Sequence, residues 1–390
     1  MIAEQRAQAR TGLLTAAAFA GMFVFGHVMV LLGAVLPALS SRLVFDAAGI
    51  GTLFVWMNTA MLACSLVLGF AMDRYGMKPP LVLGPMLAAG ALVLIARASR
   101  FEDLIPAVML MGFGGGALNG ATNTLVADLH ENAQKKSSAL NLLGVFFGIG
   151  ALFMPFAIGA LLEKFSITWL LLAASFLCVV AGVYSGALRF PEPKQGHGIP
   201  WHEAPRFLKS PLVLAMAALL FFQSGVEFTL GGFMSTYFTR ELGMTVGSAS
   251  YVLAAYWATV IAARVTMSRL VLGADPNRVV MFCAMGACAG TAVAISGNLV
   301  LSVIGILVAG FSMAGIFPTM LGIAGSKFPE HSGSVFGILF TCALMGGMTL
   351  PWVTGQIAQA RGLVWVFVVV SWAFAMITLL SRAVARAGRS

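Results

Sequence analysis

Glu227 is the residue best placed to do chemistry, because it is an acid inside a long apolar segment, residues 211–238. A charged side chain at the centre of a bilayer costs about 2.5–3.5 kcal/mol. The carboxyl must therefore face a cavity, pair with a partner or carry a proton. Gln223 lies one helical turn earlier on the same face. We interpret the two as a site for substrate and proton coupling; a hydrogen-bonded structural acid is the alternative.

His27 is a second candidate, midway along the apolar segment 13–39. Histidine titrates near neutral pH, so it could exchange a proton or bind substrate. We expect His27 and Glu227 to lie at similar depth across a central cavity. A buried histidine that only packs is the alternative.

Asn119 and Asn123 share one helical face within the segment 104–127. Buried amides need hydrogen-bond partners. Together with the aromatic faces of Tyr256 and Trp257, they suit a neutral hydroxylated or amphipathic solute. Hydrogen bonds between helices are the alternative role for the amides.

A charged motif, GFAMDRYGMK, occupies residues 69–78 between two apolar segments. A carboxylate at a helix end can face the N-terminus of a neighbouring helix, and a glycine permits a tight turn. Asp128 either pairs with Arg74 or is a solvated acid. The corresponding second-half segment is 264–278, which begins at Arg264.

The composition requires these residues to sit in a membrane. The chain has 390 residues, of which 59% are hydrophobic and 9% are charged, whereas soluble domains carry about 25% charged residues. An ordinary soluble enzyme and a disordered chain are both excluded. Since one span needs roughly 20 apolar residues, we predict an all-α polytopic protein with twelve transmembrane helices. Their limits are 13–39, 50–72, 79–97, 104–127, 138–162, 166–188, 211–238, 248–270, 278–296, 299–324, 333–358 and 363–381.

The net charge of +9 is a topology signal. Most of the Lys and Arg residues fall on one side of these spans, and the positive-inside rule makes that side cytoplasmic. We expect both termini in the cytoplasm, a multi-pass protein of the inner (cytoplasmic) membrane, contact with membrane lipid and no nucleic-acid partner. The first apolar segment is too long for a cleavable signal peptide.

The chain divides near its middle. Residues 189–210 are rich in proline and charge and predict a cytoplasmic linker between domains 1–188 and 211–390. Glycine, proline and glycine recur at the same spacing in the fifth and eleventh spans, as Gly150, Pro155 and Gly159 and as Gly346, Pro351 and Gly355. Such parallel repeats are typical of transporters.

Other chemistry finds no support in the residues. The five cysteines lie in apolar spans without metal-ligand spacing, so we predict no metal. Gly114, Gly115 and Gly116 lack the context of a phosphate loop and predict close helix packing instead. We therefore expect no enzyme activity and no cofactor, and a monomer.

The motif at residues 69–78 resembles the signature loop of the major facilitator superfamily. The resemblance implies two pseudo-symmetric six-helix bundles, a loop that latches them on the cytoplasmic side, and transport by alternating access. It implies a cytoplasmic gate made of Asp73, Arg74, Gly76, Lys78, Asp128 and, from the second half, Arg264. The second-half counterpart departs from the pattern, because Ser268 and Arg269 stand where Asp73 and Arg74 stand.

A narrower resemblance links several segments to the fucose-galactose-glucose:proton symporter branch. They are NTLVADL, ALNLLGVFFGIGALFMP, VEFTLGGFMSTYF and GIFPTMLGIAGSKF, together with Arg264. By this resemblance, Gly33 and Asn119 stand where fucose permeases keep two acids. Gly144 and Phe147 stand near the family's sugar site, which makes the expected substrate pocket more apolar.

These observations predict a secondary active transporter for a small organic solute, sugar-like or another metabolite, with protons as the candidate coupling ion. Three alternatives stay open: an efflux transporter for amphipathic compounds, an uncoupled facilitator, and a membrane receptor or assembly factor on the same fold.

Overall fold

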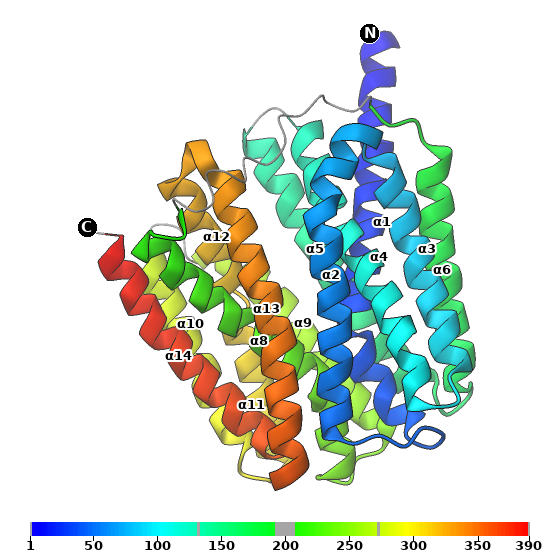
Figure 1. Cartoon of the computed structure of the whole chain (residues 1–390), viewed down its shortest axis with the longest axis vertical. Coiled ribbons are helices and arrows are strands. Elements are labelled where there is room, and N and C mark those ends of the chain that lie inside the picture. Colours follow the sequence, from blue (N-terminus) through cyan, green and yellow to red (C-terminus); the bar gives the residue numbers. More distant parts are fainter. Residues whose placement is uncertain (1, 131–132, 192–206, 271–273, 389–390) are drawn as a thin grey trace. The chain divides into compact units, whose positions relative to one another are not determined.

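The computed structural model describes residues 2–130, 133–191, 207–270 and 274–388, and all regular elements in this part of the chain are helices (Figure 1). Twelve helical stretches among these residues are long and apolar enough to cross a membrane. A helix satisfies its own backbone hydrogen bonds, which the hydrocarbon interior requires. The prediction of an all-α polytopic protein with twelve spans is confirmed, with small differences at the helix ends.

The contacts divide the chain into two compact units. The first contains the described part of residues 1–44 and 59–198. Its elements are α1 (Ile2–Leu39), α2 (Ala47–Tyr75) from Thr59 onward, α3 (Lys78–Arg97), η1 (Phe101–Asp103), α4 (Leu104–Leu129), α5 (Ala133–Leu161) and α6 (Ile167–Ala187). Within this unit α1 packs along α5 and α4, and α3 packs along α6 and α4 (Figure 1).

The second unit contains residues 45–58 and the described part of residues 199–390. Its elements are the start of α2, α8 (Pro211–Arg240), α9 (Val246–Leu270), α10 (Pro276–Ala294), α11 (Leu299–Met313), α12 (Ile316–Lys327), η2 (Pro329–His331), α13 (Ser332–Arg361) and α14 (Trp365–Ala387). Here α8 packs along α13 and α14, and α10 packs along α11 and α14. This repeats the order of the first unit, where α1 packs along α5 and α3 along α6.

The repeated glycines make the same contact in both units. A Cβ atom on Gly150 of α5 would overlap the carbonyl oxygen of Phe23 in α1, and one on Gly346 of α13 would overlap the carbonyl oxygen of Phe221 in α8. Small residues allow helix backbones to approach this closely in a membrane. The internal repeat read from the sequence therefore corresponds to equivalent helix pairs.

The three consecutive glycines of α4 serve helix packing, as predicted. A Cβ on Gly114 would lie 2.7 Å from the Gly84 carbonyl oxygen in α3, and one on Gly116 would lie 2.9 Å from the Met61 carbonyl oxygen in α2. Gly115 faces side chains of α1 and α2. All three positions exclude a larger side chain.

The start of α2 is held to α13 by backbone and side-chain contacts inside the second unit. Asn58 is fully buried, and its Nδ2 donates to the Gly347 carbonyl oxygen at 3.2 Å. A Cβ on Gly51 would lie 2.6 Å from the Pro351 carbonyl oxygen. The predicted domain limits, 1–188 and 211–390, stay a prediction, and residues 192–206 of the predicted linker lie outside the described residues.

The tenth predicted span differs from a single continuous helix. The structure breaks it at Ala314 and Gly315, between α11 and α12. Pro318 has no backbone N–H and cannot donate to the carbonyl of Ala314, so the helical ladder loses a bond at this point. Interrupted helices of this kind occur at substrate and ion sites in transporters.

Candidate functional site

Three side chains in the second unit form one electrostatic group. The Glu227 carboxyl of α8 interacts with the Arg264 guanidinium of α9, and both interact with the Tyr256 hydroxyl. The helices α8 and α9 pack together, which brings these positions into range. Glu227 and Arg264 are half-buried, whereas Tyr256 is fully buried. The arrangement places a compensating positive charge beside the intramembrane acid.

Arg264 was predicted as part of the cytoplasmic gate because the segment 264–278 corresponds to the signature loop of the first half, and that role stays a prediction. The structure shows its charge interacting with Glu227 and Tyr256. A guanidinium inside an apolar bundle gains most from an acid partner, and Glu227 supplies one.

The Glu227 face of α8 borders open space. Gly231 lies one turn further along the same face and is buried, yet a Cβ atom placed there would meet no atom within 4 Å. Ser224, one turn before Glu227, keeps part of its surface exposed, as Glu227 does. The helix face that carries Glu227 therefore has open space at Gly231, one turn from the carboxyl.

Three further polar atoms on α8 are buried without a hydrogen-bond partner among the described residues. On the side of α8 that carries Glu227, they are Oε1 of Gln223, which is 1% exposed, and the hydroxyl of Ser235, one turn beyond Gly231; the hydroxyl of Thr236 is a third such atom on this helix. A buried polar atom left unpaired costs about 1–3 kcal/mol. Such atoms can form hydrogen bonds with a polar ligand. Gln223 was predicted from its spacing to Glu227; Ser235 was missed, although its spacing to Glu227 is also helical.

Tyr256 and Trp257 connect the charged group to the broken helix. The Tyr256 hydroxyl donates a hydrogen bond to the Met313 sulfur at 2.9 Å, at the last residue of α11. The rings of Tyr256 and Trp257 meet edge to face with centroids 5.5 Å apart. A movement at the break between α11 and α12 can therefore reach Tyr256 directly. The signal for this break was present in the sequence as Gly315 and Pro318.

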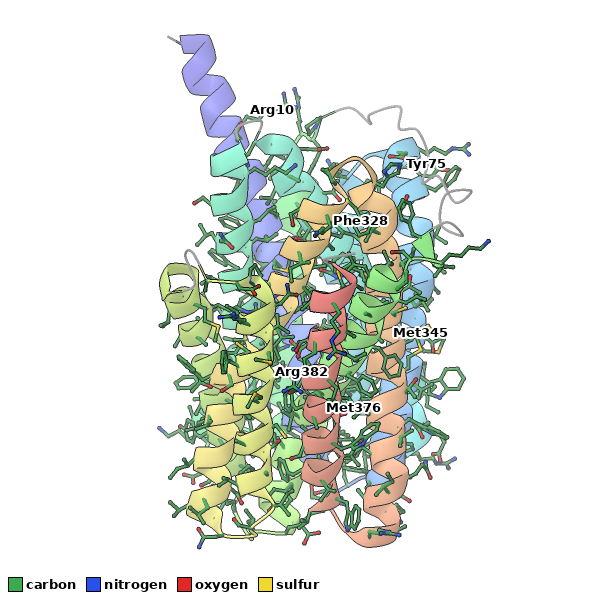
Figure 2. The ribbon with its side chains drawn as sticks, turned by 90° about the vertical axis from the view of Figure 1, so that its left-hand side faces the viewer. Arg10, Tyr75, Phe328, Met345, Met376 and Arg382 are labelled. Carbon is green, nitrogen blue, oxygen red and sulfur yellow. The ribbon has the colours of Figure 1, made fainter. Side chains whose placement is uncertain are left out.

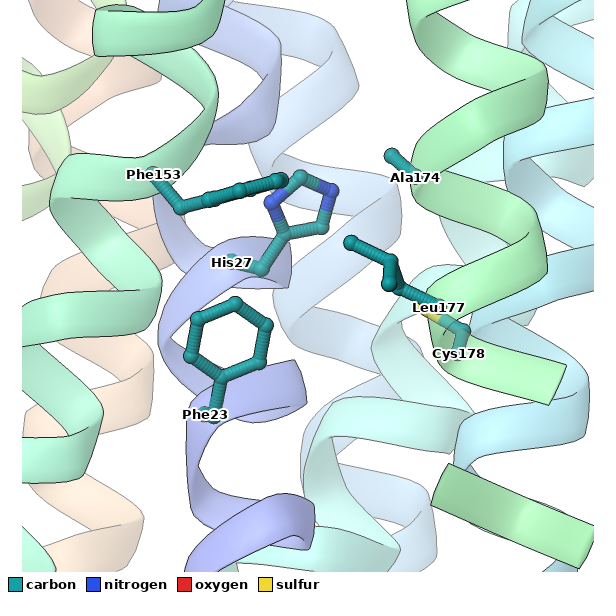
Figure 3. A pocket seen from close by; sticks show the side chains of 6 residues that line it. All are labelled: Phe23, His27, Phe153, Ala174, Leu177 and Cys178. Carbon is teal, nitrogen blue, oxygen red and sulfur yellow. The ribbon is translucent and has the colours of Figure 1, made fainter. Parts of the chain in front are cut away.

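His27 lies in a small apolar pocket of the first unit, between α1, α5 and α6 (Figure 3). The side chains around it are Phe23, Phe153, Ala174, Leu177 and Cys178. The imidazole is 2% exposed, meets the Phe153 ring edge to face at 5.9 Å, and has no hydrogen-bond partner among the described residues. The space does not admit a water molecule. This placement favours a packing role, and a role in transport stays a prediction.

The other first-unit candidates have local partners. Asn123 donates from Nδ2 to the Asn119 carbonyl oxygen at 2.8 Å and to its Oδ1 at 3.3 Å. Asn119 is half-buried and Asn123 is exposed. Phe147 is buried, and its ring packs against Phe25 with centroids 5.5 Å apart. The structure brings the two amides together as predicted, but their part in substrate binding stays a prediction.

The signature loop has the backbone that its sequence requires. Gly76 ends α2 with a positive φ of 78°, a conformation that glycine adopts without strain. The Arg74 guanidinium lies 5.4 Å from the centre of the Tyr75 ring, and Lys78 donates to the Leu188 carbonyl oxygen at 3.1 Å. Asp73 is half-buried. Asp128 is exposed near the end of α4, and its pairing with Arg74 stays a prediction.

Known proteins resemble this chain along almost its whole length. An uncharacterized MFS-type transporter of Bacillus subtilis, YfkL, is 25% identical over 89% of each chain. The solved nucleoside transporter NupG has a TM-score of 0.78 at 16% identity, over 97% of this chain and 99% of its own. The fucose:proton symporter FucP of E. coli has a TM-score of 0.66 at 17% identity, over 96% and 98%.

These structural likenesses fall at low identity, so they show the fold and leave the substrate open. Neither the fucose branch nor the nucleoside transporters are singled out, because both match with similar coverage. The sequence profile of the Major Facilitator Superfamily matches residues 14–230 and 216–387, which include both units. The chain therefore belongs to the Major Facilitator Superfamily, whose members are membrane transporters and not enzymes.

Proposed function

We propose that this protein is a secondary active transporter that moves a small organic solute by alternating access, with proton coupling at Glu227. The observation that carries the proposal is the Glu227–Arg264–Tyr256 group beside open space on α8. A bundle that only needed stability would gain from apolar residues at these positions. Retaining a charged pair beside open space suits a site that exchanges a proton.

The charge balance suggests how coupling works. With Glu227 ionised, its negative charge offsets that of Arg264. When Glu227 takes a proton, the guanidinium loses its partner and can attract an oxygen of the solute. Gln223 and Ser235 offer further polar contacts on the same helix. Solute and proton then favour each other's binding, because each compensates for the other's effect on Arg264.

The solute we expect is a small hydroxylated metabolite. The polar groups around Glu227 are neutral apart from Arg264, and hydroxyl groups can both donate to the carboxyl and accept from the guanidinium. Two solved proteins of the same fold are named as a nucleoside transporter and a fucose:proton symporter. The resemblance to the fucose-galactose-glucose:proton symporters supports the same class of solute.

We further propose that the protein lies in the inner (cytoplasmic) membrane with both termini in the cytoplasm and acts as a monomer. The clustering of Lys and Arg at one set of helix ends supports this orientation.

The test measures protons and solute together. Purified protein is first screened by thermal stability with L-fucose, D-xylose and uridine, since a ligand that binds the folded state raises its melting temperature. The stabilising solute is then added outside liposomes that contain protein and a pH-sensitive dye. We expect internal acidification with the native protein and none with Glu227→Gln, while Glu227→Gln still exchanges labelled solute across the membrane.

Glu163→Gln is the matched control, because Glu163 is an exposed acid after α5. It should leave acidification unchanged. Acidification that persists in Glu227→Gln would remove this residue from coupling. Solute movement without acidification in the native protein would identify an uncoupled facilitator. Outward solute movement driven by inward protons would identify an efflux transporter, and exchange of none of the bound solutes would favour a receptor.

A further inference from the structure

A concave site of about 470 Å³ lies between the start of α8 and the end of α14. Its walls include Arg382, Arg386, Leu379, Ala383, Pro211 and Ala215. All of these residues belong to the second unit, and none takes part in the Glu227 group. Figure 2 shows Arg382 on α14 together with Met376, which lies earlier in the same helix.

Arg382 and Arg386 are one helical turn apart, and both are exposed. Neither guanidinium has a hydrogen bond or an ion pair with any residue that the structure describes, and no acid lines the site. Two like charges at this spacing destabilise a helix. The pair therefore lacks a counter-charge within the described protein, and an anion bound between the two guanidinium groups would supply it.

The start of α8 adds to the positive character of the site. Pro211 is the first residue of this helix, and its N-cap, Ser210, makes no capping hydrogen bond through its side chain. The first backbone N–H groups of a helix have no partner inside the helix and carry a partial positive charge. Pro211 itself has no backbone N–H, and it places this end of α8 at the wall of the site.

An apolar strip leads from the arginines along α14. Leu379 lies one turn before Arg382 and is 53% exposed, and Trp372 lies two turns before Leu379 and is 52% exposed. The Trp372 ring meets Phe222 of α8 edge to face, with centroids 5.5 Å apart. Residues at these spacings share one helix face. A ligand that is anionic at one end and apolar along its length would match both features.

We propose that the Arg382–Arg386 site binds the phosphate headgroup of an anionic phospholipid, whose acyl chain lies along Leu379 and Trp372. Both helices are membrane spans, so lipid is in contact with them at high concentration. The positive-inside rule places this end of α14 at the cytoplasmic leaflet, where anionic lipids attract Lys and Arg. Free phosphate would use the arginines but not the apolar strip.

The experiment compares lipids by their effect on thermal unfolding of the purified full chain in detergent. The probes are phosphatidylglycerol, phosphatidylcholine with the same acyl chains, and inorganic phosphate. We expect phosphatidylglycerol to raise the melting temperature at far lower concentration than phosphatidylcholine. Each arginine near the headgroup is worth about a fivefold change in affinity, so Arg382→Gln with Arg386→Gln should raise the half-saturating concentration about 30-fold.

The matched control is Arg97→Gln with Lys164→Gln, which removes the same charge from two exposed positions of the first unit. It should respond to phosphatidylglycerol as the native protein does. Arg386→Gln alone, in the last turn of α14, provides a milder variant if the double variant fails to fold, and should raise the half-saturating concentration about fivefold. Equal protection by the two lipids, equal protection by inorganic phosphate, or an unchanged response in the arginine variants would overturn the proposal.

Discussion

At the scale of single residues, the pairing of Glu227 with Arg264 has a cost that apolar residues would avoid. Both groups lose hydration inside the bundle, and their attraction offsets this loss only in part. Tyr256 adds a polar hydroxyl to the same group and is itself tied to Met313. Such a group is held together by charge balance, so removing one member should affect the others.

Removing Arg264 alone should therefore destabilise the protein more than removing both charges. Arg264→Gln leaves the Glu227 carboxylate without its partner and should lower the free energy of unfolding by about 1–3 kcal/mol, since the pair is half-buried. Glu227→Gln combined with Arg264→Gln should recover most of this loss. Thermal unfolding in detergent measures the loss of stability in Arg264→Gln and its recovery in the double variant.

The control for this pair is Arg278→Gln. The Nε atom of Arg278 lies 3.8 Å from Oδ2 of Asp275. The Arg278 side chain is 77% exposed and the Asp275 side chain is 41% exposed. An exposed ion pair contributes about 0–1 kcal/mol, so this variant should melt close to the native protein. If Glu227→Gln combined with Arg264→Gln melts at no higher temperature than Arg264→Gln alone, the charges of Glu227 and Arg264 do not compensate each other.

The sequence was sufficient to find Glu227 but not its partner. An acid in an apolar segment stands out because its burial is costly. Arg264 lies near the end of its span, where a positive charge is also expected from topology alone. The interaction of Arg264 with Glu227 depends on the packing of α8 against α9, which no local pattern in the sequence shows. His27 shows the same limit, because the sequence gives its depth in the span but not that it faces α5 and α6.

At the scale of helices, glycine positions set how closely α1 approaches α5 and α8 approaches α13. The sequence predicted this repeat from spacing alone, and the structure gives its cause as backbone contact at Gly150 and Gly346. The break between α11 and α12 was missed, because apolar composition continues across it and hydropathy does not register a lost backbone hydrogen bond.

Gly346→Ala should destabilise the protein because its methyl group would overlap the Phe221 carbonyl oxygen and force α13 away from α8. Overpacking of this kind costs about 1–3 kcal/mol. Gly337 lies on the same helix, and a Cβ there would meet no atom within 4 Å. Gly337→Ala should therefore be neutral or stabilising by up to about 1 kcal/mol, as expected for alanine in an open helix position. Thermal unfolding compares the two, and an equal response would argue against backbone contact as the cause.

At the scale of the whole molecule, composition and span length determined most of the architecture in advance. Twelve apolar stretches of sufficient length leave little choice but helices that cross a membrane. The limits of the compact units were harder to predict, since α2 is one continuous helix whose first residues, up to Asn58, group with the second unit. Contacts such as the hydrogen bond of Asn58 with Gly347 join residues far apart in sequence, and no local sequence pattern predicts them.

The distribution of Lys and Arg makes a final prediction about the orientation of the twelve spans. The turn after α2 at Gly76 is flanked by Arg74 and Lys78, and the end of α14 carries Arg382 and Arg386, so both should be cytoplasmic. The turn at Gly362 should then face the opposite side.

Alkaline phosphatase, which is active only outside the cytoplasm, should be active when fused after Gly362 and inactive when fused after Gly76 or Ser390. Green fluorescent protein at the same positions should show the reverse pattern. Phosphatase activity at Ser390 with inactivity at Gly76 would require an odd number of crossings between them, and activity at both would invert the whole orientation.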